Sequence, residues 1–370
     1  MNSTSPDPIF NSFSAATKDD WLKAAQLELG DANPFQKLTF EKENLTFLPY
    51  YDQHDHDVNK FNQLRPSSNE FLGSRAWHNM PIVNVNLESK ANQIALSDLN
   101  SGADGIIFNL LNPTIDVPAL LDNIEWPHCA ISFTGASSEQ FLNELHRHVT
   151  ARKFDVKTLI GCVFRNKPIG KEWESLSLFE HWTNFHPLGI DIIEKKSAAE
   201  QIASALAKTV RQIDFLTDKG LSVSQAIQAH AFQVPIEEDF FLTIAKLKVL
   251  RILWDSVTKQ YNTQLNIPLF IHAQAEPWIK KEFQPNGNML KSTTAAMSAI
   301  FGGCDGLTIV PESSEDSMME RIARNVSSVL REESHLSKVA DPTAGSYYLD
   351  SLIEQLADQS WLVFQKQMTE

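Results

Sequence analysis

The sequence predicts an α/β protein, a (β/α)8 barrel of the TIM type preceded by an N-terminal arm of helical and extended segments. Eight short apolar runs alternate with amphipathic helical stripes over most of the chain. The length of 370 residues, with 42% hydrophobic residues, accommodates one barrel of about 250 residues and an extra segment. The N-terminal section is too small to form a core of its own. We therefore assign residues 1–75 to the arm and residues 76–370 to the barrel.

The arm is predicted to contain a capped helix and a hairpin. Asp19 or Asp20 can cap a helix that ends at Gly30. Two short strands follow, at Lys37–Phe40 and Leu45–Leu48. Because this section cannot bury its apolar side chains alone, we expect it to pack on another surface.

The barrel prediction rests on apolar runs of strand length. The eight runs are Ile82–Asn86, Gly105–Leu110, Cys129–Phe133, Thr158–Val163, Leu188–Ile193, Ala229–Val234, Pro268–Ala273 and Gly306–Val310. Helical stripes between and after them are Ile202, Leu206, Val210 and Ile213, then Ile244, Leu247, Trp254 and Val257, and finally Leu352, Leu356, Trp361 and Phe364. Periodicity does not show whether a sheet closes, so an open doubly wound sheet is the alternative.

The segment from Asn288 to Leu349 restricts the backbone most tightly. A helix over Met289–Ile300 should end at Gly302 and Gly303, because glycine adopts positive φ. After the next strand, Ser313 and Asp316 form a start of the capping-box kind. The helix that follows carries an apolar stripe, which consists of Met319, Ile322, Val326 and Val329.

Charge and cysteine usage exclude several classes of function. The formal charge of -14 argues against nucleic acid as a partner. No apolar run approaches the length of a membrane span, about 18 residues. The N-terminus lacks the features of a signal peptide. Cys129, Cys162 and Cys304 are odd in number and lie in or beside apolar runs. We interpret them as reduced core residues of a cytoplasmic protein, with no disulfide framework and no zinc site.

Two groups of polar residues are candidates for a site. His272 and Gln274 close a strand, where the active-site residues of a barrel lie. We interpret His272 as a satisfied core or rim histidine, with a catalytic role as the alternative. The cluster Asp52–Asp57 could bind a transition metal, but we interpret it as a solvated acidic loop. We therefore predict no metal ligand and no cofactor-binding residue.

Several motifs in order resemble the cobalamin-dependent methylmalonyl-CoA mutases. They are the pair Gly302-Gly303, R-x-A-R-N at Arg321–Asn325, E-E-S at Glu332–Ser334 and V-A-D-P-x-x-G-S-Y-Y at Val339–Tyr348. Trp21, Leu29-Gly30, Asn33-Pro34-Phe35 and Leu48-Pro49-Tyr50 resemble the opening of the small subunit. After the glycine pair, Cys304–Pro311 follows the small-subunit pattern, an acidic residue and then apolar strand residues and proline, and Asn288–Lys291 resembles its N-M-L-R.

The resemblance implies a fold without the catalytic set. His272–Gln274 matches the start of the family's H-x-Q-T-S-G, but Ala275–Pro277 replaces T-S-G. Asp191–Ser197 has no histidine where the family's Y-H-x-x-E-A-G-A lies. Trp77–Ile82 stands opposite T-I-R-Q-Y-A-G and has neither its arginine nor its tyrosine. Asp52–Asp57 also lacks the glycine of the cobalamin motif Asp-x-His-x-x-Gly.

The resemblance therefore implies a small, non-catalytic subunit of a heterodimeric mutase. The large catalytic subunit would be the partner, would hold adenosylcobalamin and would interconvert methylmalonyl-CoA and succinyl-CoA. The arm would wrap this partner, and the present chain would bind no cofactor and would contain no cobalamin-binding domain. One alternative is a barrel that binds an acyl-CoA and receives its cobalamin domain in trans. Another is a barrel hydrolase or lyase that uses His272 with a carboxylate such as Glu276.

Overall fold

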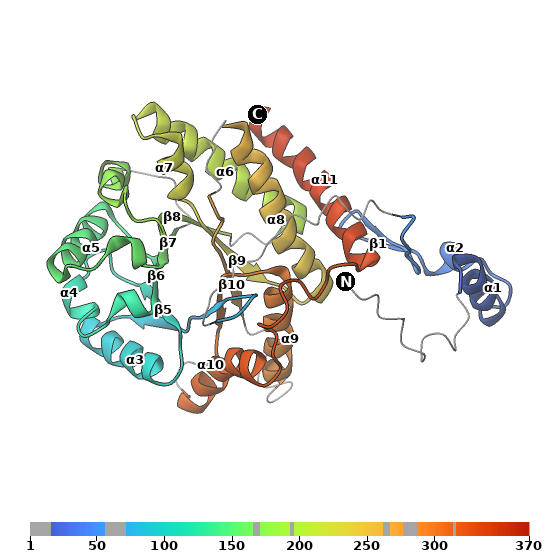
Figure 1. Cartoon of the computed structure of the whole chain (residues 1–370), viewed down its shortest axis with the longest axis horizontal. Coiled ribbons are helices and arrows are strands. Elements are labelled where there is room, and N and C mark those ends of the chain that lie inside the picture. The colour runs from blue at the N-terminus through green and yellow to red at the C-terminus, as the bar shows by residue number, and fades with distance from the viewer. Residues whose placement is uncertain are drawn as a thin grey trace, which may run out of the picture.

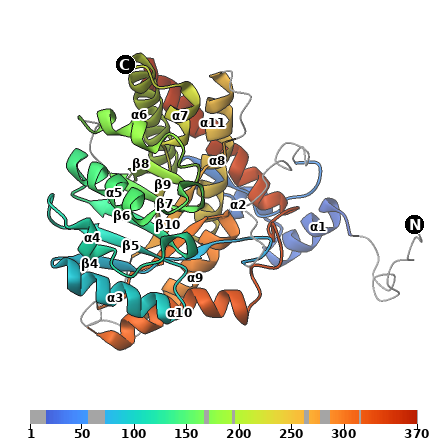
Figure 2. The same cartoon turned by 60° about the vertical axis from the view of Figure 1, so that its left-hand side comes forward.

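The chain folds into a parallel β-barrel surrounded by helices, with small N-terminal elements at one side (Figures 1 and 2). The computed structural model describes residues 16–55, 72–165, 171–192, 196–261, 267–276, 287–313 and 316–369. The barrel strands are β3 (His78–Asn79), β4 (Ile82–Val85), β5 (Gly105–Leu110), β6 (Ala130–Gly135), β7 (Gly161–Arg165), β8 (Phe185–Asp191), β9 (Phe232–Ile236), β10 (Ile271–Ala275) and β11 (Gly306–Ile309).

The barrel closes because β3 and β4 are two pieces of one extended segment. β3 pairs in parallel with β11, and β4 pairs in parallel with β5. Between the two pieces, the Met80 amide donates to the Leu307 carbonyl at 2.9 Å, and the Pro81 carbonyl accepts from the Ile107 amide at 2.9 Å. This segment therefore bonds to the last strand on one side and to the second on the other. The predicted barrel is confirmed, and each predicted strand overlaps an observed one with ends shifted by three residues at most.

Helical elements follow the strands and cover the outside of the barrel. They are α3 (Glu88–Asn100), α4 (Val117–Leu120), α5 (Glu139–Arg152), the 3-10 helix η4 (Lys171–Phe179), α6 (Ala198–Asp218), α7 (Val223–Gln228), α8 (Phe240–Gln260), α9 (Gly287–Gly302) and α10 (Ser317–Glu332), with short 3-10 turns η2 (Trp126–His128) and η3 (Val156–Thr158). The C-terminal helix α11 (Tyr347–Thr369) packs across α6 and α8 (Figure 1). None of the described helices is long and apolar enough to cross a membrane.

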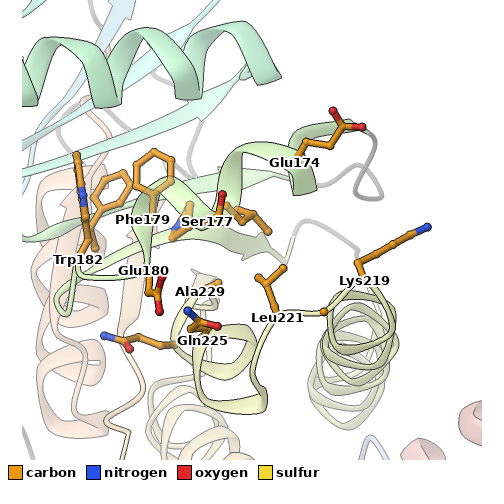
Figure 3. A pocket seen from close by; sticks show the side chains of 14 residues that line it. Glu174, Ser177, Phe179, Glu180, Trp182, Lys219, Leu221, Gln225 and Ala229 are labelled. Atoms are coloured by element: carbon orange, nitrogen blue, oxygen red, sulfur yellow. The ribbon is translucent and has the colours of Figure 1, made fainter.

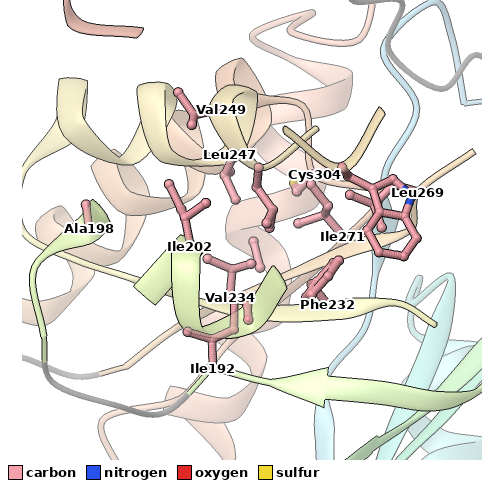
Figure 4. Packing of buried hydrophobic residues seen from close by; sticks show 14 of the residues in the cluster. Ile192, Ala198, Ile202, Phe232, Val234, Leu247, Val249, Leu269, Ile271 and Cys304 are labelled. Carbon is pink, nitrogen blue, oxygen red and sulfur yellow. The ribbon is translucent and has the colours of Figure 1, made fainter. Parts of the chain in front are cut away.

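The largest apolar core lies between the strands and the helices on the α6, α8 and α11 side. Figure 4 shows Ile202 of α6, Leu247 of α8 and Val234 of β9 within this cluster. The predicted stripes on α6, α8 and α11 contribute to it as expected, with Val210 and Trp361 only partly buried. The three cysteines are free, as predicted; Cys162 and Cys304 are buried and Cys129 is half-buried.

The N-terminal elements differ from the prediction in two details. The helix α1 (Lys18–Glu28) is capped by the Thr17 side chain, and Asp20 is the capping-box partner rather than the cap. The first predicted strand begins too early, because Asn33 caps a short helix, α2 (Pro34–Leu38), that has proline at its first position. The hairpin itself consists of β1 (Phe40–Lys42) and β2 (Leu45–Phe47).

The helix α10 also differs from the prediction. Its N-cap is Asp316, whose side chain accepts from the Met318 amide, so the Ser313 side chain does not cap the helix. Its buried residues are small or medium in size, namely Ala323, Ser327 and Leu330. The predicted stripe of Met319, Ile322, Val326 and Val329 is instead partly exposed, and three of its members line a surface groove. Ser327 can be buried because its hydroxyl accepts from the Trp77 indole at 2.7 Å.

Candidate functional site

The candidate site lies at the carboxyl ends of the barrel strands, where this fold carries its functional side chains. Beneath that mouth, the barrel interior is filled by fully buried side chains, which include Met80, Ile107, Cys162, Phe164 and His272. The Phe164 and His272 ring centres lie 5.8 Å apart. These side chains block the barrel axis below the mouth.

His272 is held inside this plug by a chain of hydrogen bonds. Its Nε2 lies 2.9 Å from the Thr308 hydroxyl oxygen, and that hydroxyl donates to the Met80 carbonyl. Because the hydroxyl hydrogen is already used, Nε2 must donate and the imidazole carries its proton there. Nδ1 has no hydrogen-bond partner among the residues that the structure describes, and it faces the backbone of Gly306, where an added Cβ would lie 2.5 Å from it.

The electrostatics keep this imidazole neutral. Burial, assisted by the charge of His78, lowers the pKa of His272 to about 3. The His272 side chain is fully buried and its Nε2 donates to Thr308, so neither this nitrogen nor the ring surface is accessible at the mouth. The structure therefore places His272 as a core residue and brings Gln274 toward the surface.

The mouth itself carries amide and carboxylate groups from neighbouring strands. The Gln233 side chain donates to the Gln274 carbonyl oxygen at 2.9 Å, and the Gln274 amide donates to Glu276. On the other side of the mouth, Asn109 donates to Asn84 at 2.8 Å. The carbonyl oxygen of Gln233 is buried and has no partner among the described residues.

Asp191 lies at the end of β8, beside Gln233 in the sheet register. Burial raises the pKa of Asp191 to about 6, an effect that Lys208 opposes and Glu276 reinforces. Sequence reasoning missed Asp191 and Gln233 as mouth residues. Their only signal was a polar residue in the carboxyl half of a predicted strand, which is also common in ordinary strands.

The acidic cluster near the N-terminus is described only in part. Asp52 contacts the His54 ring nitrogen at 3.3 Å, and Asp55 forms an ion pair with Lys18 at 2.9 Å. His56 and Asp57 lie outside the described residues. In the described ranges, no three or more histidine, cysteine, aspartate or glutamate side chains gather closely enough to hold a metal ion.

The motif at Val339–Tyr348 has a structural role that the sequence did not show. Asp341 accepts from Lys248 at 2.8 Å and lies 3.9 Å from the Arg75 guanidinium. At the end of the motif, the Tyr348 ring contacts Phe47 of the hairpin. The motif therefore joins α8, the start of the barrel and the N-terminal hairpin.

Comparison with known proteins identifies relatives for this fold. Residues 189–369 match the family model described as methylmalonyl-CoA mutase. The methylmalonyl-CoA mutase small subunit of Porphyromonas gingivalis is 26% identical over 97% of this chain and 64% of its own length. The small subunit of Streptomyces virginiae is 38% identical over 46% of this chain and 28% of its own length. The chain thus spans under two thirds of each of these relatives.

A solved structure of Plasmodium falciparum HPPK-DHPS is a more distant match. It covers 83% of this chain and 55% of its own, with 13% identity and a TM-score of 0.45. That likeness is too remote to bear on function. The family match covers the second half of the barrel, and the Porphyromonas gingivalis small subunit matches nearly the whole chain. The chain is therefore similar to the methylmalonyl-CoA mutase family over its second half, and to a small subunit of that family over nearly its whole length.

Proposed function

We propose that this chain is the small, non-catalytic subunit of a heterodimeric, adenosylcobalamin-dependent methylmalonyl-CoA mutase. In this proposal the larger partner holds the cofactor and isomerises methylmalonyl-CoA to succinyl-CoA. The present chain stabilises the native state of that partner by binding to it. Relatives that carry the name small subunit support this role.

The observation that carries the proposal is the exposure of the N-terminal helices. Among the described residues, none in α1 is buried, although the helix carries apolar side chains. Leu27 is 77% exposed and Leu38 is 44% exposed. Figure 1 shows α1 and α2 standing clear of the barrel. An apolar arm held away from its own core favours burial against a partner.

The hairpin divides the proposed arm into two parts. Leu45 and Phe47 are buried against the barrel, and Lys42 forms an ion pair with Asp239 at 2.7 Å. The hairpin thus serves as the root of the arm. We propose that the segment containing α1 and α2 contacts the partner. In this proposal residues 1–75 form the arm and residues 76–370 form the barrel.

The filled barrel interior supports a non-catalytic role. An acyl-CoA is anionic, whereas the mouth carries Asp191 and Glu276. His272 does not fit as a ligand of a corrin cobalt, because Nε2 donates to Thr308 and Nδ1 faces Gly306. We therefore derive no cobalamin step on this chain. The three free thiols support a cytoplasmic location.

Co-purification tests the proposal. The chain and a large mutase subunit, co-expressed with a tag on one of them, should elute together from a size-exclusion column. A variant that lacks residues 1–38 retains the hairpin root and should elute separately from the large subunit. A stable, partner-free homodimer of the full chain in the presence of the large subunit would contradict the proposal.

Calorimetry separates the main alternative, a barrel that binds acyl-CoA itself. Titration of methylmalonyl-CoA into the full chain should give no saturable heat. Saturable binding to the chain without its partner would favour that alternative.

A further inference from the structure

A cavity lies at the opposite end of the barrel from the mouth. It measures about 450 Å³ and is bounded by η4, the start of β8, the turn between α6 and α7, and α7 (Figure 3). Phe185 and Pro187 line it at the beginning of β8, whereas Asp191 of the mouth ends the same strand. The volume lies within the range of small-molecule sites, about 300 to 1,000 Å³. This cavity is therefore separate from the candidate site.

Rigid aromatic side chains form one wall of the cavity. The Phe179 and Trp182 ring centres lie 4.8 Å apart, and the Trp182 and Phe185 ring centres lie 5.2 Å apart. All three side chains are almost fully buried, so mutual packing fixes their positions. Leu221 points from the α6–α7 turn toward η4 and narrows the cavity (Figure 3). This wall is suited to contact the aromatic or aliphatic part of a small-molecule ligand.

The polar groups of the cavity favour a cation. Figure 3 shows Glu180 and Gln225 directed toward the same space from opposite walls, whereas Glu174 and Lys219 extend away from its centre. The Lys219 ammonium lies 5.5 Å from the ring of Phe215, a residue that does not line the cavity. Within the part of the chain that the structure describes, no hydrogen bond or ion pair engages the Glu180 carboxylate. One carboxylate next to aromatic rings matches an ammonium group on an apolar body.

We propose that this cavity, formed by η4, β8, α6 and α7, binds a small primary amine with an aromatic or aliphatic body. The ammonium group pairs with Glu180, and the body lies against Phe179, Trp182 and Leu221. Active sites of this fold lie at the carboxyl ends of the strands, so a site at the other end binds its ligand without taking part in catalysis. The inference does not depend on the role proposed for the whole chain.

Two probes of opposite charge test the assignment by titration calorimetry on the full chain. The cation 2-phenylethylamine should bind saturably, and the anion 3-phenylpropionate, which has a similar body, should not. Added salt should weaken the binding of the amine, because the carboxylate is exposed to solvent. No saturable heat from the amine at millimolar concentration, or equal binding of both probes, would overturn the proposal.

Variants locate the binding. Glu180→Gln should weaken the binding of the amine about two- to fivefold, the range expected for one exposed ion pair. Glu28→Gln removes an exposed carboxylate on α1 and should leave the affinity unchanged. Leu221→Trp should fill the cavity and abolish binding, with its fold checked by circular dichroism. Wild-type affinity in both Glu180→Gln and Leu221→Trp would place the amine elsewhere and refute the site.

Discussion

Arg331 donates to both carboxylate oxygens of Asp104, at 3.1 Å and 2.6 Å, across 227 residues of sequence. The same guanidinium donates to the Trp77 carbonyl at 2.8 Å and lies 4.9 Å from the Trp77 ring. Asp104 in turn accepts from the Asn79 amide at 2.7 Å. These contacts tie α10 to β3 and to the turn before β5. They hold the barrel at the seam where its first and last strands meet.

Loss of this contact should destabilise the barrel. We expect Arg331→Ala to lower the free energy of unfolding by about 3 kcal/mol, because Asp104 would stay largely buried without its partner. Urea denaturation followed by circular dichroism measures the change. Arg147→Ala removes an exposed arginine with a surface ion pair and should change stability by less than about 0.5 kcal/mol. A similar decrease in the free energy of unfolding in both variants would show that the seam contact stabilises the fold no more than a surface ion pair does.

The hydroxyl of Thr308 should be needed for its hydrogen bonds. Thr308→Val keeps the shape but leaves the His272 Nε2 proton and the Met80 carbonyl without partners, at a cost of about 1 to 3 kcal/mol. Thr308→Ser keeps the hydroxyl and should lose less. Chemical denaturation of both variants gives the comparison, and equal stability of the valine variant and the wild type would show that these hydrogen bonds do not stabilise the fold.

The elevated pKa of Asp191 predicts a pH-dependent difference in stability. Its carboxyl takes up a proton near pH 6 in the folded chain, and near pH 3.8 when it is not buried. At pH 7 the buried charge therefore opposes folding, and Asp191→Asn should raise the free energy of unfolding by about 1 to 3 kcal/mol. As the pH falls from 6 to 4, the wild-type carboxyl becomes neutral and the advantage should vanish. Denaturation curves at pH 7 and pH 4 measure it, and a constant difference between them would refute the shift.

The exposed arm should matter for association and not for the fold. Leu27→Asp should leave the thermal stability of the isolated chain unchanged, since this side chain is 77% exposed, and should weaken binding to the large subunit. Leu362→Asp introduces the same change at a leucine of α11 that is 66% exposed. It should bind the partner like the wild type. Binding measured by surface plasmon resonance would contradict the arm proposal if Leu27→Asp had no effect.

Much of the barrel was predictable because its strands are continuous apolar runs between turn residues. The seam was harder to predict, since β3 is two residues long and the Trp77–Ile82 segment lacks a strong period. The hydrophobicity pattern also did not predict which side of α10 is buried. Ser327 is polar by composition and becomes a core residue only through Trp77, 250 residues away.

The sequence predicted the location of the candidate site at the strand ends, but it did not predict which of its side chains are buried. The position of His272 and Gln274 at a strand end indicated the mouth of the barrel. The burial of His272 depends on Thr308 and Met80, which come from other strands and leave no local signal. The cavity beneath the barrel was not predicted, because its lining comes from several separate segments of the chain.

A turnover assay tests the central proposal most directly. The purified chain, supplied with adenosylcobalamin and methylmalonyl-CoA, should form no succinyl-CoA, whereas its complex with the large subunit should form it under the same conditions. Formation of succinyl-CoA by the chain alone would contradict its assignment as the non-catalytic subunit.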